Sequence, residues 1–123
     1  MIARTHRFHG HGSLRYVYQN GQVVRGPVMI LKYVRNDRRK TWRAAVVVSR
    51  KVHKSAVVRN RIRRRIYEQL RVQLTDLADP MDIVCVVHSD AVASMPAREL
   101  GTLLAAQLKK AGLIRGIVER KEL

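Results

Sequence analysis

The stretch that decides the fold runs from residue 48 to residue 71 and reads VSRKVHKSAVVRNRIRRRIYEQLR. It begins as the end of an apolar strand and continues as a helix, predicted over residues 55–74 with Ser55 as its N-cap. At the helical period, the apolar side chains share about a third of the helix surface, which predicts one buried face. The residues of that face are Val58, Ile62, Ile66, Gln69 and Leu70.

Arginine dominates the rest of this helix. Five arginines fall within the seven positions 59–65, and Glu68 is the single acid between residues 48 and 71. Like charges one turn apart destabilise an isolated helix, so we expect the cluster to bind a polyanion. The planar guanidinium group also suits the oxygens of phosphate. The residues expected to point away from the core are Asn60, Arg64, Tyr67 and Arg71.

The composition indicates one globular domain with a nucleic-acid partner. The chain has 123 residues, of which 46% are hydrophobic, and its net charge is +16. Residues 32–71 hold fifteen lysines and arginines against two acids, which is +13 of that total. A basic membrane-surface protein is the alternative, but the apolar stripe of the long helix is committed to a core.

Catalytic groups are sparse in this sequence. The one cysteine, Cys85, excludes a disulfide framework, and a reducing cytoplasm fits it. We expect its thiol to be buried and inert. Neither a glycine-rich phosphate loop nor a Ser/His/Asp set is recognisable, so we expect a binding protein without catalytic residues or metal ligands. Two metal-site alternatives stay open, at His6, His9 and His11 and at Asp79, Asp82 and Asp90.

Three segments follow from the pattern of charge and hydropathy. Residues 1–12 are expected to form a flexible basic arm, residues 13–112 a single RNA-binding domain, and residues 113–123 a charged C-terminal tail. A short helix is predicted from Ser13, as its cap, to Gly21, which we expect in the left-handed conformation.

The order of the remaining elements predicts the fold class. Residues 28–34 and 43–49 are predicted strands that pair as an antiparallel hairpin. Residues 82–88, DIVCVVH, are nearly all apolar and predict a central strand. A last helix is predicted from Ser94, and Gly112 ends it. We expect an α/β two-layer sandwich of a small sheet and helices, for which the general preference is a right-handed crossover.

Aromatic side chains near the basic residues favour RNA as the partner. Tyr16 and Tyr18 are placed to stack on unpaired bases, although Tyr18 packed in the core with its hydroxyl at the rim is an open alternative. The basic connection at 36–40 has the charge of a loop near a partner. An arginine-rich helix beside an open sheet face suits structured or single-stranded RNA.

These residues resemble a known family. The segment RNRIRR at 59–64, preceded by VSRK at 48–51, is similar to the signature of the bacterial ribonuclease P protein subunit. The opening also fits, with RF at 7–8 and a short helix ending YQNG at 18–21. The resemblance covers nearly the whole chain and is weak after residue 90.

The resemblance implies a function and a fold. Members of this family bind a large catalytic RNA in a cytoplasmic ribonucleoprotein, and the complex is an endonuclease and hydrolase that removes the 5′ leader from precursor tRNA. The RNA performs the hydrolysis with Mg²⁺, which the RNA and substrate bind, and no membrane or obligate protein partner is implied. The implied fold is the two-layer sandwich shared with a ribosomal-protein domain, with a left-handed β-α-β crossover.

The resemblance also assigns site residues. The first aromatic of the family's F-x-x-V-F pattern is Leu14 here and the second is Tyr18, so we expect Tyr16 to compensate. The candidates for the leader groove are Leu14, Tyr16, Tyr18 and Lys32. The candidates for binding the catalytic RNA are Arg50, Lys51, Lys54, Arg59, Asn60, Arg61, Arg63 and Arg64.

Two other functions stay open at this point. One is a ribosomal or ribosome-associated RNA-binding protein with the same two-layer fold. The other is a metal-dependent nuclease that would use Asp82 and His53.

Overall fold

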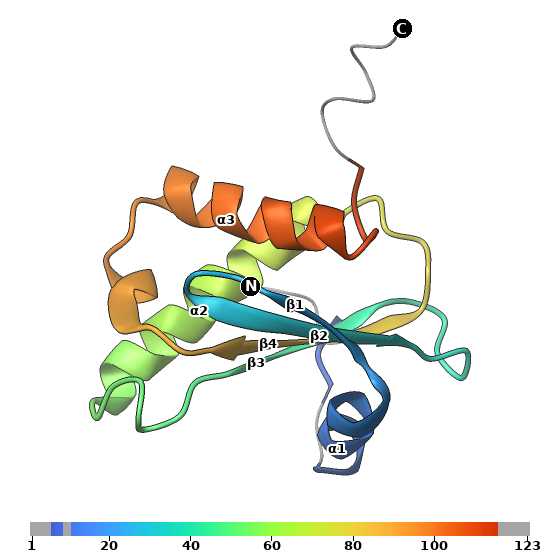
Figure 1. The fold of residues 1–123 in the computed structure, drawn as a ribbon, viewed down its shortest axis with the longest axis horizontal. Helices are drawn as coiled ribbons and strands as arrows, with labels where there is room; N and C mark the ends of the chain where they lie inside the picture. Colours follow the sequence, from blue (N-terminus) through green and yellow to red (C-terminus); the bar gives the residue numbers. More distant parts are fainter. Residues whose placement is uncertain (1–5, 9–10, 116–123) are drawn as a thin grey trace, which may run out of the picture.

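The computed structural model describes residues 6–8 and 11–115. Three α-helices and a four-stranded sheet make up this part of the chain (Figure 1). The elements in order are α1 (His11–Asn20), β1 (Gln22–Arg25), β2 (Met29–Arg35), β3 (Arg43–Val47), α2 (Ala56–Gln73), β4 (Met81–Val87), the 3₁₀ helix η2 (Asp90–Ala93) and α3 (Ala97–Lys110).

The sheet has the strand order β1-β2-β4-β3. β4 pairs antiparallel with β2 and parallel with β3, so α2 is the crossover between two neighbouring parallel strands. The predicted hairpin between β2 and β3 is therefore wrong, because β4 lies between them. The central position predicted for β4 is confirmed, and its run from Ile83 to Cys85 is completely buried. An apolar strand of this kind gains most burial with a neighbour on each side.

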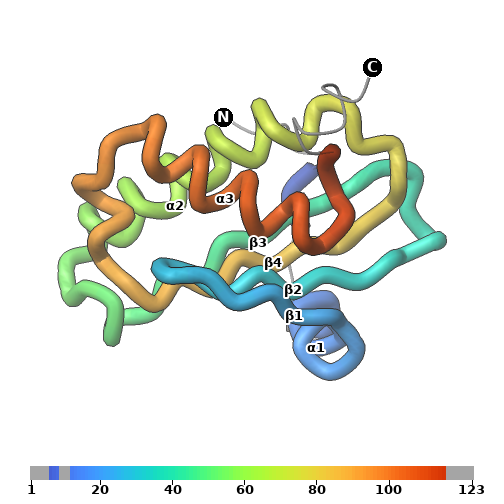
Figure 2. The backbone as a smooth tube through the Cα atoms, turned by 45° about the horizontal axis from the view of Figure 1, so that its top comes forward, coloured from blue at the N-terminus to red at the C-terminus, as the bar shows by residue number. Residues whose placement is uncertain are grey.

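Helices lie on both faces of the sheet. Figures 1 and 2 show α2 and α3 together over one face, with α1 against the other. The main core between the sheet and α2 and α3 includes the fully buried Ile66 and Leu104. A smaller core forms where Val17 of α1 packs with Ala45 and Val84. The mixed α and β architecture is confirmed. The sheet forms the predicted two-layer sandwich with α2 and α3, and α1 packs against the other face of the sheet.

The long helix α2 forms as its sequence predicts. The Ser55 side chain accepts a hydrogen bond from the Val58 backbone N–H, which caps the first turn. Ile62, Ile66 and Leu70 are buried at the predicted helical spacing. The cap and the apolar stripe therefore fix both where this helix starts and which side of it faces the core.

The expectation that Tyr67 points away from the core is wrong. Its hydroxyl accepts a hydrogen bond of 3.2 Å from the Val46 backbone N–H, which lies in β3. Burial raises the pKa of the Tyr67 hydroxyl, so it stays protonated. The buried arc of α2 is wider than the apolar side chains alone indicate, because a tyrosine combines an apolar ring with a polar tip.

Tyr67 is one of three residues that cover β3, an edge strand of the sheet. Arg7 forms a parallel β-bridge with Ala44, and Arg63 donates a hydrogen bond to the Val48 carbonyl just after the strand. An open strand edge invites pairing with other chains. Here the N-terminal segment and α2 occupy part of that edge.

The N-terminal segment at 6–8 is packed against the sheet. Phe8 is buried, and the His6 ring stacks on Trp42 with ring centroids 3.9 Å apart. The His6 Nδ1 also lies 2.8 Å from the Trp42 carbonyl oxygen. α1 begins at His11, two residues before the predicted cap Ser13. These contacts and the helix start lie within the range where the sequence predicts a flexible arm.

Two glycines stand at helix ends for different reasons. Among the described residues, Gly112 is the glycine with positive φ, at 78°, and it follows α3 as predicted. The left-handed conformation expected of Gly21 is wrong. A Cβ at Gly21 would lie 2.5 Å from the Val17 carbonyl oxygen and 3.0 Å from that of Tyr33, so the position requires glycine for a close approach.

Other boundaries also differ from the predictions. α3 begins at Ala97 with Pro96 at its N-cap, whereas Ser94 closes η2 by donating its N–H to the Ala91 carbonyl. β1 was not predicted, because its four residues are mostly exposed and lack an apolar pattern. Leu113 is buried although the tail was predicted to begin there. The predictions for His9 and for residues 116–123 lie outside the described residues.

A buried ion pair joins β3 to β4. Two nitrogens of Arg43 donate to the two carboxylate oxygens of Asp82, each at 2.9 Å, and both side chains are almost fully buried. Asn36 donates a third hydrogen bond to Asp82 at 2.9 Å. The Arg43 guanidinium also lies over the Phe8 ring, 4.7 Å from its centroid. Asp82 is therefore committed to the fold, which argues against the nuclease and metal alternatives that would use it.

We predict that Asp82→Ala lowers the free energy of unfolding by about 3–5 kcal/mol, because Arg43 stays buried without its partner. Urea unfolding followed by circular dichroism measures this. The matched control is Asp79→Ala, since Asp79 is exposed and lies 3.6 Å from Arg35, and it should cost less than about 1 kcal/mol. Equal unfolding midpoints for the two variants would contradict the buried pair's role.

Candidate nucleic-acid interface

Four of the five clustered arginines on α2 donate hydrogen bonds to backbone carbonyls. Arg59 donates to the carbonyls of His53 and Lys54, each at 2.9 Å. Arg63 donates to the Val48 carbonyl and, at 2.6 Å, to the Asn60 side chain. These two arginines therefore hold the loop that leads from β3 into α2.

Arg61 and Arg65 make equivalent bonds on the other side of the helix. Arg61 donates through Nε to the Ala93 carbonyl at 2.8 Å. Arg65 donates through its two terminal nitrogens to the carbonyls of Val92 and Met95. These bonds tie α2 to η2 and to the segment before α3. Arg65 was not predicted as a site residue, although its spacing of four from Arg61 places the two on one side of the helix.

These hydrogen bonds to carbonyls show that the fold itself, and not a polyanion alone, stabilises the arginine cluster. A carbonyl dipole offsets part of the unfavourable charge density but removes no formal charge. Each guanidinium has five N–H donors, and the bonds described here use one or two of them. The arginines are therefore fixed in place with donors still available to a partner.

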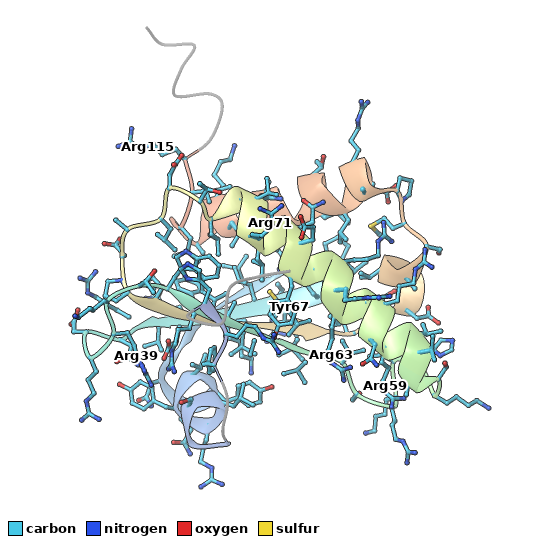
Figure 3. All side chains as sticks on the ribbon, turned by 180° about the vertical axis from the view of Figure 1, so that it is seen from behind. Arg39, Arg59, Arg63, Tyr67, Arg71 and Arg115 are labelled. Atoms are coloured by element: carbon cyan, nitrogen blue, oxygen red, sulfur yellow. The ribbon has the colours of Figure 1, made fainter. Side chains whose placement is uncertain are left out.

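A second group of cations is exposed and unanchored. Arg64 on α2 and Arg50, Lys51 and Lys54 in the preceding loop are exposed. In the described part of the chain, none of these four side chains donates a hydrogen bond or forms an ion pair. Figure 3 shows Arg59 and Arg63 along the same helix, with Arg71 near its far end. Arg71 is paired with Glu68, and this hydrogen bond lowers the pKa of the Glu68 carboxyl.

The predicted leader-groove residues separate into two places. The Lys32 ammonium lies over the Tyr18 ring, 4.3 Å from its centroid, and Tyr18 is 44% exposed, which argues against the alternative that it packs in the core. Leu14 is half-buried against the small core under α1, and it lies one helical turn before Tyr18 on the same side of α1. Lys32, Tyr18 and Leu14 therefore meet on the sheet face that α1 covers in part.

Tyr16, which was expected to compensate for Leu14, lies on a different surface from Tyr18 and Lys32. It is 52% exposed and lines an open cleft of about 790 Å³ between the start of α1 and the loop after β2. Arg38 and Arg39 line the same cleft, and Figure 3 shows Arg39 close to α1. Leu14 and Tyr16 are 200° apart on a helix, which explains why they face different surfaces.

Two groups with potential for catalysis, Cys85 and His53, are used within the fold. Burial raises the pKa of the Cys85 thiol to about 12, as expected of a structural cysteine. The His53 Nδ1 accepts a hydrogen bond from the Ser55 backbone N–H. Within residues 6–8 and 11–115, no three His, Cys, Asp or Glu side chains lie together as a metal site requires. The α2 surface combines fixed arginines with exposed cations, and the α1 side of the molecule presents the exposed Tyr16 and Tyr18.

Comparison with known sequences identifies the family to which a protein with this basic surface belongs. A sequence profile described as Ribonuclease P matches residues 2–112. This chain belongs to the ribonuclease P protein family.

Similar ribonuclease P proteins cover nearly the full length of the chain. The ribonuclease P protein component of Pseudanabaena sp. is 35% identical over 117 residues, which are 94% of this chain and 99% of the relative. The same component of Chloroflexus aurantiacus is 36% identical over 113 residues, which are 92% of this chain and 82% of the relative. The chain is therefore the protein component of an endoribonuclease that also contains RNA.

Solved ribonuclease P proteins share the fold. The Staphylococcus aureus protein matches with a TM-score of 0.78 at 23% identity, covering 89% of this chain and 98% of that one. The Thermotoga maritima protein matches with a TM-score of 0.74 at 19% identity, over the same shares of the two chains. These comparisons give no support to the ribosomal alternative. Within the described residues, the helices are too short or too polar to cross a membrane.

We predict that the two kinds of arginine respond differently to substitution. Arg64→Gln should weaken binding to ribonuclease P RNA and reduce its log–log salt slope by roughly 0.7–0.9 per lost phosphate contact, with unchanged stability. Arg65→Gln should instead lower the free energy of unfolding by about 1–3 kcal/mol, because it leaves two carbonyls without their donor. Filter binding at several salt concentrations and urea unfolding measure the two effects. A stability loss for Arg64→Gln alone would contradict this division.

Proposed function

We propose that this chain is the RNA-binding subunit of ribonuclease P, which binds the catalytic RNA and the 5′ leader of precursor tRNA. In this role it assists the endonucleolytic cut that gives mature tRNA 5′ ends. The observation that carries the proposal is the presentation of the RNRIRR segment. Its arginines are fixed by backbone carbonyls, and exposed cations surround them. Such fixed donors lose little freedom when a phosphate binds.

The two surfaces have different tasks in this proposal. The α2 surface and its preceding loop would contact the catalytic RNA. Its residues are Arg50, Lys51, Lys54, Arg59, Asn60, Arg61, Arg63 and Arg64. The face beside α1 would hold the leader, where the Tyr18 ring can stack on an unpaired base and Lys32 can meet a phosphate.

The chemistry of hydrolysis is assigned to the RNA. Mg²⁺ bound by the RNA and the substrate would supply the metal-assisted step, and no step is assigned to a protein residue. The protein would contribute positive charge. Cations along α2 reduce phosphate repulsion when RNA and precursor meet, which lowers the demand for free Mg²⁺. A cytoplasmic location is part of the proposal, supported by the single buried thiol at Cys85.

We predict that the protein lowers the Mg²⁺ concentration at which ribonuclease P RNA cleaves precursor tRNA. Cleavage of labelled precursor is measured over a Mg²⁺ series with and without the protein. The protein alone should cleave nothing. Cleavage by protein freed of RNA, surviving nuclease pretreatment, would contradict the proposal.

A matched pair of variants tests the leader surface by the affinity of the protein–RNA complex for precursor and for mature tRNA. Tyr18→Ala should weaken binding of precursor with a leader by about 1–3 kcal/mol, the loss of one stacked base, and leave binding of mature tRNA unchanged. Tyr16→Ala is the control, since Tyr16 lines a different cleft. Equal effects on precursor and mature tRNA would remove Tyr18 from the leader surface.

A further inference from the structure

A groove lies between α2 and the start of α3. Its volume is about 480 Å³, within the range of small-ligand pockets. It lies on the sheet face opposite α1, so a nucleotide stacked on Tyr18 cannot also fill it (Figures 1 and 2). The residues that line it are Arg61, Arg64, Arg65, Gln69, Ala97 and Leu100, together with Glu68.

The floor of this α2–α3 groove is largely apolar. Ala97 and Leu100 of α3 lie on one side, and the side chains of Arg61 and Arg65 lie on the other. Both arginines are held by carbonyls of the 92–95 segment. A guanidinium fixed in this way presents a flat face, and flat guanidinium faces stack on nucleobases.

The charge around the groove favours an anionic group at one end. Arg64 is exposed and has no hydrogen-bond or ion-pair partner in the described part of the chain. The acid in the lining, Glu68, is one helical turn further along and is paired with Arg71. α3 begins at the groove with Ala97, and Pro96 supplies no side-chain cap for its first turn. The positive charge of Arg61 and Arg64 favours a phosphate at their end of the groove.

We propose that the α2–α3 groove holds one unpaired nucleotide of an RNA. The base lies on the apolar floor between the fixed arginines and α3, and the phosphate lies at Arg64. An acidic peptide would satisfy the charge but not the flat apolar floor. This inference rests on the proposed function, because it adds a second nucleotide site to an RNA-binding protein.

The test uses the free protein and nucleoside monophosphates. Adenosine and uridine monophosphate are titrated into ¹⁵N-labelled protein, and the backbone amides of Ala97 and Leu100 are followed by NMR. Both amides should shift saturably with either nucleotide. Inorganic phosphate at equal concentration should leave Leu100 unmoved, because it lacks a base to occupy the floor.

Two substitutions on α3 make the test specific. Ala97→Trp fills the groove and should abolish the shift of Leu100. Ala106→Trp places the same side chain at an exposed position of the same helix, outside the groove lining, and should leave that shift intact. Well-dispersed spectra of both variants show that they fold.

Four results would overturn the proposal. The first is the absence of a nucleotide shift in the native protein, and the second is an unchanged nucleotide shift in Ala97→Trp. The others are an equal shift with phosphate alone, which would mean an adventitious ion only, and an equal shift with a short aspartate peptide. The proposed function is tested separately, by whether the native protein lowers the Mg²⁺ concentration that ribonuclease P RNA needs for cleavage. If it does so and nucleotides cause no shift in the native protein, only the groove is excluded.

Discussion

The structure depends on how α2 carries its crowded positive charge. Five arginines between residues 59 and 65 repel one another, and acidic neighbours do not offset them. The helix instead directs four of them at backbone carbonyls of the segments that it contacts. Such charge-assisted hydrogen bonds are stronger than neutral ones and leave part of each guanidinium available. The free chain can therefore fold with this cluster before any RNA is present.

The same bonds join the fold to its function. Arg63 and Tyr67 reach β3 and its end, while Arg61 and Arg65 reach the η2 region. Side chains that the family resemblance assigns to RNA therefore also position the elements around α2. Under the proposed function, such dual use favours arginine over lysine at these positions. Arginine has five donors in a rigid planar fork, whereas lysine has one compact ammonium group on a flexible stem.

Local patterns predicted the elements whose burial follows a simple period. The apolar stripe and Ser55 cap defined α2, and DIVCVVH identified the central strand. Local patterns could not predict which distant segments pair. β4 lies between β2 and β3 in the sheet, and the Arg43–Asp82 ion pair joins residues 39 positions apart. The RNA surface was predicted as a list of basic residues with Asn60, beside leader-groove candidates on the first helix and at Lys32. The division of its arginines into fixed and free ones depends on where distant carbonyls lie, and no sequence pattern reports that.

The most direct test of this account replaces Arg59, Arg61, Arg63 and Arg65 with lysine, which keeps the net charge at +16. The affinity for ribonuclease P RNA and the free energy of unfolding are measured for this variant and the native chain at one salt concentration. We predict that both fall, because the compact lysine ammonium lacks the rigid, planar, five-donor fork that holds a backbone carbonyl while it presents further donors to a phosphate. Native affinity and native stability in the lysine variant would show that positive charge alone suffices, and would contradict the account.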